Sequence, residues 1–205
     1  RCSPSESADV KKRQCLPAAA TAAALLLSFG SASAQTDVLK KIRESGAITM
    51  GVRDASGAMS FTLGPGSYAG FHVEVCERVI ADIGKALQIG KVNVKYQLVT
   101  PQNRMPLVQN GTVDIECGTT TNNAARQKDV AFAPTLYVEG VRIAVKAASG
   151  IASPAQLSGK TVAATTGSTS VQLVRKLKRD GASDIAEVLA KDNSEGFLLL
   201  ESGRA

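Results

Sequence analysis

The feature that most limits the fold of this 205-residue chain is a regular alternation of strand and helix signals. Asp37 can cap a helix that ends at Gly46, and a short apolar strand over 47–52 follows. Alternation at this spacing predicts an α/β fold with largely parallel sheets. Further strands are expected over 92–99, 113–117, 141–145, 161–166 and 185–189, with helices over 71–87, 101–110, 153–159, 170–178 and 194–203.

The helix expected over 71–87 follows a turn-rich stretch over 57–70 and is predicted to be amphipathic. Its apolar residues Val75, Val79, Ile83 and Leu87 fall four apart. With Glu74 and Arg78 paired at i,i+4, this spacing is typical of an amphipathic helix.

A short internal repeat of one sequence pattern indicates two similar α/β lobes. Residues 107–114, LVQNGTVD, form a helix end, a glycine cap and a strand that carries Asp114. Residues 199–205, LLESGRA, begin in the same form. We therefore expect a second strand just past Ala205 and a second lobe that is incomplete in this chain.

The N-terminus has the layout of a secretory signal peptide. A basic segment at 11–13 precedes an apolar run over 16–29, and the small residues Ala32, Ser33 and Ala34 stand before Gln35. The run is shorter than the roughly 20 residues that a membrane span needs. Residues 1–34 are therefore predicted to be a signal peptide that directs the chain to the periplasm; an uncleaved anchor is the alternative.

Export determines how the cysteines are interpreted. Cys2 and Cys15 would leave with the signal, whereas Cys76 and Cys117 would remain. Two thiols in an oxidising compartment are a candidate disulfide, and free buried thiols are the alternative. Two distant cysteines and the single histidine, His72, do not fill a zinc shell, so no metal or other cofactor is expected.

The charge and composition disfavour nucleic acid as a partner. The net charge is +6, without a run of five or six like charges, and the chain lacks tryptophan. Such a surface is usually only solvated. It mildly favours a small anionic ligand.

Several stretches together resemble the type II periplasmic binding proteins of amino-acid ABC importers (bacterial solute-binding protein family 3), in particular the glutamate/aspartate-binding group. The likeness extends from about Asp37 to the last residue. The stretches that carry it are DVLKKIRESG at 37–46, QNR at 102–104, QNGTVD at 109–114, CGTTTNN at 117–123, ARQK at 125–128, LSGKTV at 157–162 and LESGRA at 200–205.

The resemblance implies two α/β lobes with a cleft between them that closes on an amino acid. Lobe one would span 35–135, and lobe two would span 136–205 and lack the segment that returns to lobe one. It also implies that the protein delivers glutamate or aspartate to a membrane ABC permease and is not an enzyme.

The ligand would need paired charges, because an isolated ion in a closed cleft is costly. Arginine suits a carboxylate, since its planar fork makes two hydrogen bonds. The resemblance implies that Arg126 holds the α-carboxylate and that Arg53 and Arg104 face the side-chain carboxylate. Any one of these residues alone would be interpreted as a surface charge, but all three match the family's positions.

Hydroxyl and amide groups complete the implied site. Thr119 and Thr121 match the family's hydroxyl and backbone contacts, although a threonine-rich turn can also cap a helix. Thr169 stands beside the free N–H groups of a helix N-terminus, which suit a carboxylate, and would reach the ligand from lobe two. Asn193 stands where glutamate/aspartate binders often have a histidine.

Two further departures concern Pro101, where the family usually has serine, and Met59, which is often aromatic. With Asn193 they leave the preferred amino acid open. The acidic group that normally holds the ligand's ammonium would lie beyond Ala205.

Two alternatives remain. The first is an exported enzyme on the same fold, similar to a cyclohexadienyl dehydratase, which would need a poised acid or base in the cleft. The second is a truncated product without function.

Overall fold

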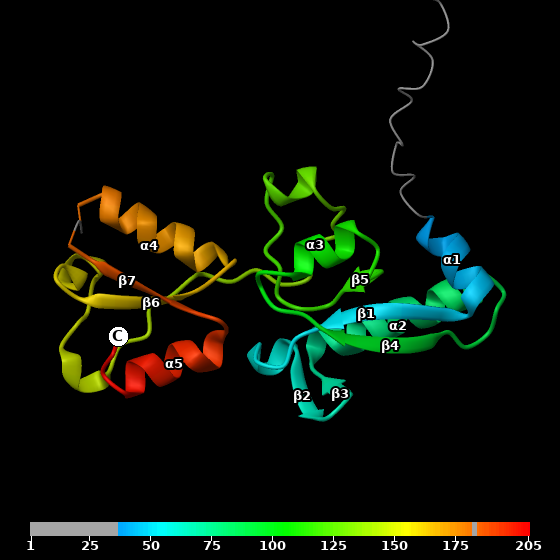
Figure 1. The fold of residues 1–205 in the computed structure, drawn as a ribbon, viewed down its shortest axis with the longest axis horizontal. Coiled ribbons are helices and arrows are strands. Elements are labelled where there is room, and N and C mark those ends of the chain that lie inside the picture. The colour runs from blue at the N-terminus through cyan, green and yellow to red at the C-terminus, as the bar shows by residue number, and fades with distance from the viewer. Residues whose placement is uncertain (1–36, 182–183) are drawn as a thin grey trace, which may run out of the picture. The chain divides into compact units, whose positions relative to one another are not determined.

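The computed structural model describes residues 37–181 and 184–205, so the predicted signal peptide lies outside the described residues. The first sheet is parallel, with β1 (Ala47–Val52) between β4 (Asn93–Leu98) and β5 (Ile115–Glu116). β1 pairs with β4 along its whole length, and Figure 1 shows the two side by side. The parallel sheet predicted from the alternation is thus present.

Helix α1 (Val38–Ser45) begins and ends as its sequence predicts. The carboxylate of Asp37 accepts a hydrogen bond from the Lys40 N–H at 3.2 Å, which caps the first turn. Gly46 follows with φ +64°, and its N–H donates to the Ile42 carbonyl. These caps place the buried Ile42 against the sheet.

Helix α2 (Phe71–Ala86) confirms the predicted amphipathic helix, and its end lies within one residue of the predicted one. It buries Val73, Ile80 and Gly84, whereas Val79 is 44% exposed. Ile83 and Leu87 are partly buried and pack against the core. A spacing of four residues drifts by about 40° per step on a helix of 3.6 residues per turn, so not every residue of such a series can face the core. Buried residues from α1, α2 and the sheet form the first core: Ile42, Ile48, Met50, Val52, Val73, Ile80, Val92 and Cys117.

The segments around the first sheet are more irregular than expected. The turn-rich stretch contains a short hairpin of β2 (Phe61–Gly64) and β3 (Ser67–Ala69) after the 3₁₀ turn η1 (Gly57–Met59). The helix expected from residue 101 begins later, as α3 (Arg104–Gln109), because a turn over 100–103 precedes it. A 3₁₀ turn, η2 (Arg126–Lys128), follows β5 and its threonine-containing turn.

A second parallel sheet contains β6 (Thr161–Thr165) and β7 (Ala186–Ala190). Helices α4 (Thr169–Arg179) and α5 (Asn193–Glu201) pack on it, and the short turns η3 (Ala147–Ser149) and η4 (Pro154–Leu157) precede it. Its own core consists of Leu157, Val162, Ala164, Val171, Val174 and Ile185.

The strand predicted over 141–145 is absent from the described residues. Ile143 packs on the second core, but this segment forms no ladder with another strand. Since a strand depends on hydrogen bonds to a neighbour, apolar alternation alone does not produce one. A groove of about 590 Å³ lies between residues 141–146, β6 and α5. Within 37–181 and 184–205, no helix is both long and apolar enough to cross a membrane.

A buried carboxylate joins three elements of the first sheet. The Asp114 side chain is 1% exposed and lies 2.8 Å from the Lys41 ammonium of α1. Its other oxygen accepts from the Thr49 N–H of β1, also at 2.8 Å. Asp114 thereby fixes α1 and the β5 segment to β1.

We expect Asp114→Ala to destabilise the fold by about 3 kcal/mol, because it leaves Lys41 and the partly buried Thr49 N–H without their partner. Urea unfolding measures this loss. The matched control is Asp82→Ala, which removes a pair with Lys85 in which both side chains are more than 70% exposed. It should leave the midpoint unchanged; equal losses in the two variants would contradict the role of Asp114.

Candidate functional site

The predicted site residues of the first sheet gather where its parallel strands end. Arg53 follows β1 directly, Arg104 comes after β4 and its turn, and Gly118 and Thr119 follow β5. Strands that run parallel end at one edge of a sheet, and ligands of open α/β sheets bind there. The topology therefore brings together residues that lie more than 60 positions apart in the chain.

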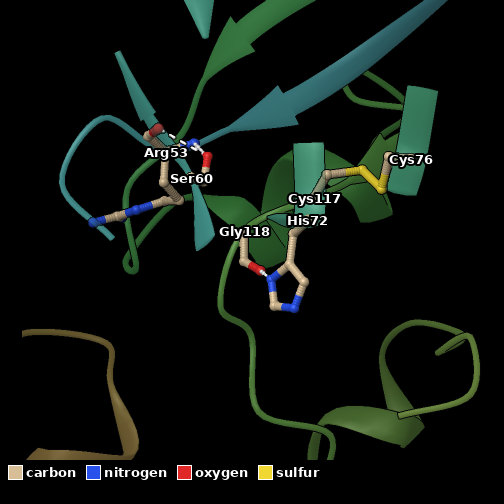
Figure 2. The surroundings of a disulfide bond; sticks show 6 residues. All are labelled: Arg53, Ser60, His72, Cys76, Cys117 and Gly118. Atoms are coloured by element: carbon tan, nitrogen blue, oxygen red, sulfur yellow. Dashed lines mark hydrogen bonds between the residues drawn. A yellow bond between two sulfur atoms is a disulfide. The ribbon is translucent and has the colours of Figure 1, made fainter. Parts of the chain in front are cut away.

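Arg53 is held by its backbone and is 2% exposed. Its N–H donates to the Ser60 hydroxyl, which in turn donates to the Arg53 carbonyl, both at 2.9 Å (Figure 2). Its Nη1 donates to the Val99 carbonyl at 3.3 Å, whereas its buried Nε has no partner in the described structure. Burial lowers the pKa of Arg53, and the carboxylates of Asp54, Glu116 and Asp192 oppose that shift.

Arg104 is the least satisfied of the three guanidinium groups. It is 4% exposed, and among the described residues neither Nε nor Nη1 has a hydrogen-bond partner. Burial lowers the pKa of Arg104 to about 10; Glu116 opposes this shift, while the positive charges of Arg126 and Arg53 add to it. The side chain therefore remains charged at neutral pH with its donors unused.

Arg126 is half-buried at the start of η2. Its N–H donates to the Asn123 side chain, and Nη1 donates to the Thr121 carbonyl at 3.0 Å. Nη2 donates to the Gly167 carbonyl at 3.2 Å, in the turn before α4. Burial lowers the pKa of Arg126, against the opposing charge of Glu116.

Glu116 at the end of β5 is a charged group that sequence reasoning missed. Its charge opposes the fall in pKa that burial causes in all three arginines. Its Oε1 is buried without a partner in the described structure. A Cβ at Gly118 would lie 2.3 Å from this oxygen and 2.7 Å from Arg53 Cγ, so only glycine leaves room for both. Its position directly before the CGTTTNN segment is the sequence signal from which it could have been predicted as a site residue.

The predicted threonines lie in the turn that follows β5. Thr119 and Thr121 are exposed, and the Thr119 hydroxyl lies 3.5 Å from that of Ser56. Thr120, which was not predicted, has a buried hydroxyl without a partner among the described residues. Together with the arginines, these groups supply several unused hydrogen-bond donors at one sheet edge.

Two predicted residues come from the helices that pack on the second sheet. Thr169 begins α4, but Ser168 is the capping residue and accepts from the Ser170 N–H. Asn193 begins α5; its amide oxygen accepts from the Thr165 hydroxyl at 3.1 Å, and its Nδ2 donates to the Ala55 carbonyl at 3.3 Å. Asn193 thus links the end of β6 to the loop after β1.

Cys76 of α2 and Cys117 after β5 form a disulfide, with an S–S distance of 2.08 Å and Cα atoms 6.3 Å apart (Figure 2). This confirms the candidate disulfide over the alternative of free thiols. The bond ties the threonine turn to α2.

The buried arginine donors without partners make this edge of the sheet suitable for an anion. Burial lowers the pKa of all three guanidinium groups; Glu116 is the carboxylate that acts on all of them, while Asp54 and Asp192 act on Arg53. A buried charge without its hydrogen-bond partners is costly. In the part of the chain that the structure describes, no three potential metal ligands cluster.

We expect Arg104→Met to stabilise the unliganded protein by about 1–3 kcal/mol at pH 7. A pKa near 10 instead of 12.5 corresponds to a penalty of about 3 kcal/mol on the charged form in the folded state. The penalty is complete below pH 10 and fades as the pH rises above it, so the gain should shrink there. Denaturant unfolding at pH 7 and pH 11 measures the gain in stability at neutral pH and its decrease at high pH. The control Arg43→Met, at an exposed position of α1, should leave the stability unchanged at both pH values. A destabilised Arg104→Met protein would show that burial of the Arg104 charge carries no such penalty.

The chain is similar to several known proteins. The profile described as bacterial extracellular solute-binding proteins, family 3, matches residues 48–199. The chain is 44% identical over 188 residues to an L-glutamate/L-aspartate-binding protein of Pseudomonas aeruginosa. This match covers 91% of this chain and 62% of that protein. It is 37% identical over 188 residues to the glutamate/aspartate import solute-binding protein of Escherichia coli, covering 92% of this chain and 62% of that protein.

Among solved structures, an ancestral amino acid-binding protein, described as a precursor of cyclohexadienyl dehydratase, matches with a TM-score of 0.70 and 26% identity. The match covers 82% of this chain and 70% of that one. The chain spans about three fifths of the length of the two bacterial relatives.

Proposed function

The chain belongs to the bacterial extracellular solute-binding proteins of family 3, and from this premise we propose that it binds an acidic amino acid, glutamate or aspartate. The family and the solved relative also confirm the predicted type II periplasmic-binding-protein fold. Two relatives named for glutamate and aspartate support the proposed ligand class.

The observation that carries the proposal is the pair of buried, unsatisfied arginines. Arg53 and Arg104 are nearly inaccessible, yet Nε of the first and Nε and Nη1 of the second lack partners among the described residues. A carboxylate supplies two acceptors and a negative charge, and so offsets both deficits. Arg126 would take the α-carboxylate, and Arg53 and Arg104 the side-chain carboxylate.

The polar residues have supporting roles in this proposal. Thr119 and Thr121 would contact the ligand from the turn after β5. Thr169 would donate to the α-carboxylate from the first turn of α4, where free N–H groups also favour an anion. Asn193 would face the side-chain carboxylate as a neutral partner.

Location and partner follow from the same proposal. The protein would act in the periplasm after export by residues 1–34 and pass its ligand to the permease of an ABC importer. Residues 35–135 and 136–205 would correspond to the two lobes. Copurification with a permease reconstituted in lipid, in the presence and absence of glutamate, tests the partner.

An enzymatic activity is the second candidate function. Two observations favour it: the solved relative described as a dehydratase precursor, and Glu116, which places a carboxylate among the arginines. Incubation with prephenate or arogenate and identification of the products distinguishes the two functions. A binding protein leaves both compounds unchanged.

We expect the full-length protein with the signal removed to bind L-glutamate or L-aspartate, and Arg53→Ala or Arg104→Ala to weaken binding by about thirtyfold to several thousandfold. Truncating one partner of a desolvated charge pair costs about 2–5 kcal/mol. Isothermal titration calorimetry measures the affinities, with Arg43→Ala as the exposed control. Binding of a neutral or basic amino acid, with no heat from either acidic one, would contradict the proposal.

Asn193→His should increase the preference for glutamate over glutamine. An imidazolium adds a positive charge opposite the second carboxylate, which glutamine lacks. Competition calorimetry with the two amino acids gives the affinity ratio, and Asn193→Gln is the neutral control. An unchanged ratio in Asn193→His would show that position 193 does not face the ligand side chain.

A further inference from the structure

Helix α2 holds the turn after β5 at two adjacent points. The first is the disulfide between Cys76 and Cys117. The second is His72, one helical turn before Cys76, whose Nδ1 lies 2.6 Å from the carbonyl oxygen of Gly118. Figure 2 shows both connections, with the imidazole ring directed at the Gly118 carbonyl.

The direction of the His72 hydrogen bond follows from its acceptor. A carbonyl oxygen only accepts, so Nδ1 carries the proton and donates it. The Gly118–Thr119 peptide is planar and trans, so the Thr119 N–H points opposite to the Gly118 carbonyl. Because that carbonyl faces α2, the Thr119 N–H faces away from α2.

The side away from α2 is the side of the candidate site. The Gly118 Cα packs against Arg53, where an added Cβ would lie 2.7 Å from Arg53 Cγ. The Thr119 hydroxyl lies beside Ser56, in the loop after β1. Among the described residues, the Thr119 N–H has no hydrogen-bond partner. A free backbone donor therefore lies beside the arginines.

This orientation is not fixed by the chain itself. Gly118 has no Cβ, so the peptide that follows it can rotate at little steric cost. The disulfide anchors Cys117, which lies before this rotatable residue. The His72 hydrogen bond is the contact that acts on the Gly118 carbonyl itself.

We propose that His72 is a positioning residue for the ligand site: its hydrogen bond to the Gly118 carbonyl aims the Thr119 N–H at a carboxylate of the ligand. The identity of the ligand rests on the proposed function, but the orientation of the peptide does not. A backbone donor held in this way binds an anion without ordering a flexible side chain, which is the advantage of preorganisation.

Two substitutions at position 72 separate the hydrogen bond from the bulk of the ring. His72→Ala removes the donor and should weaken L-glutamate binding by about tenfold to a hundredfold, the usual value of a hydrogen bond to a charged group. His72→Asn keeps an N–H donor at the place of Nδ1 and should bind within about threefold of the unaltered protein. Glu74→Ala, exposed in the same turn of α2, is the control and should bind normally.

Calorimetry measures these affinities, and mass spectrometry verifies that Cys76–Cys117 is intact in each variant. Equal affinity of His72→Ala and the unaltered protein would overturn the proposal. It would also be overturned if His72→Asn bound as weakly as His72→Ala, since the donor would then not be the cause.

A second measurement does not require the ligand to be known. In ¹H–¹⁵N spectra of the ligand-free protein, the steady-state NOE of the Thr119 amide should fall in His72→Ala and recover in His72→Asn. If the unaltered protein bound neither acidic amino acid, the proposed function would fail and this readout would decide the role of His72. A Thr119 amide equally ordered in all variants would overturn the proposal.

Discussion

The site depends on the confinement of three like charges where water is scarce. Arg53 and Arg104 are almost fully buried, Arg126 is half-buried, and burial lowers the pKa of each. Glu116 is the carboxylate whose charge acts on all three. Such an arrangement destabilises the unliganded protein and becomes favourable when an anion supplies the missing acceptors. In our proposal, the cost of the empty site is therefore the source of affinity for an acidic ligand.

Contacts from the surrounding elements hold the three arginines in place despite their mutual repulsion. The reciprocal hydrogen bonds of Ser60 fix the backbone of Arg53, and Asp114 joins α1 and β5 to β1. On the other side, the disulfide and His72 attach the turn after β5 to α2. Rigid support of this kind lowers the ordering cost of binding. The position of each guanidinium thus depends on residues that do not touch the ligand in our proposal.

A shared fold does not determine the ligand, which depends on the side chains placed at the sheet edge. The first sheet brings the arginine cluster, which suits carboxylates in general. The second sheet brings Thr169 and Asn193, and Asn193 already uses both ends of its amide within the described structure. Under the proposed function, discrimination between glutamate, aspartate and glutamine would therefore depend on this neutral side chain more than on the arginines.

Local patterns were sufficient to predict much of this protein. The caps of α1, the strand over 47–52 and the bounds of α2 follow from local sequence patterns, and the structure confirms them. The candidate disulfide followed from the two cysteines that remain after the predicted signal peptide, and the structure confirms it as well. The strand expected over 141–145 failed because a strand needs a partner that its own residues do not supply. The roles of Ser60 and His72 could not be predicted because their contacts lie 7 and 46 residues away along the chain. The same holds for Glu116, whose charge acts on the distant Arg53. Parallel strand ends bring such groups together only when the sheet forms, so the depth of the charge cluster and the direction of the Thr119 N–H are properties of the tertiary structure alone.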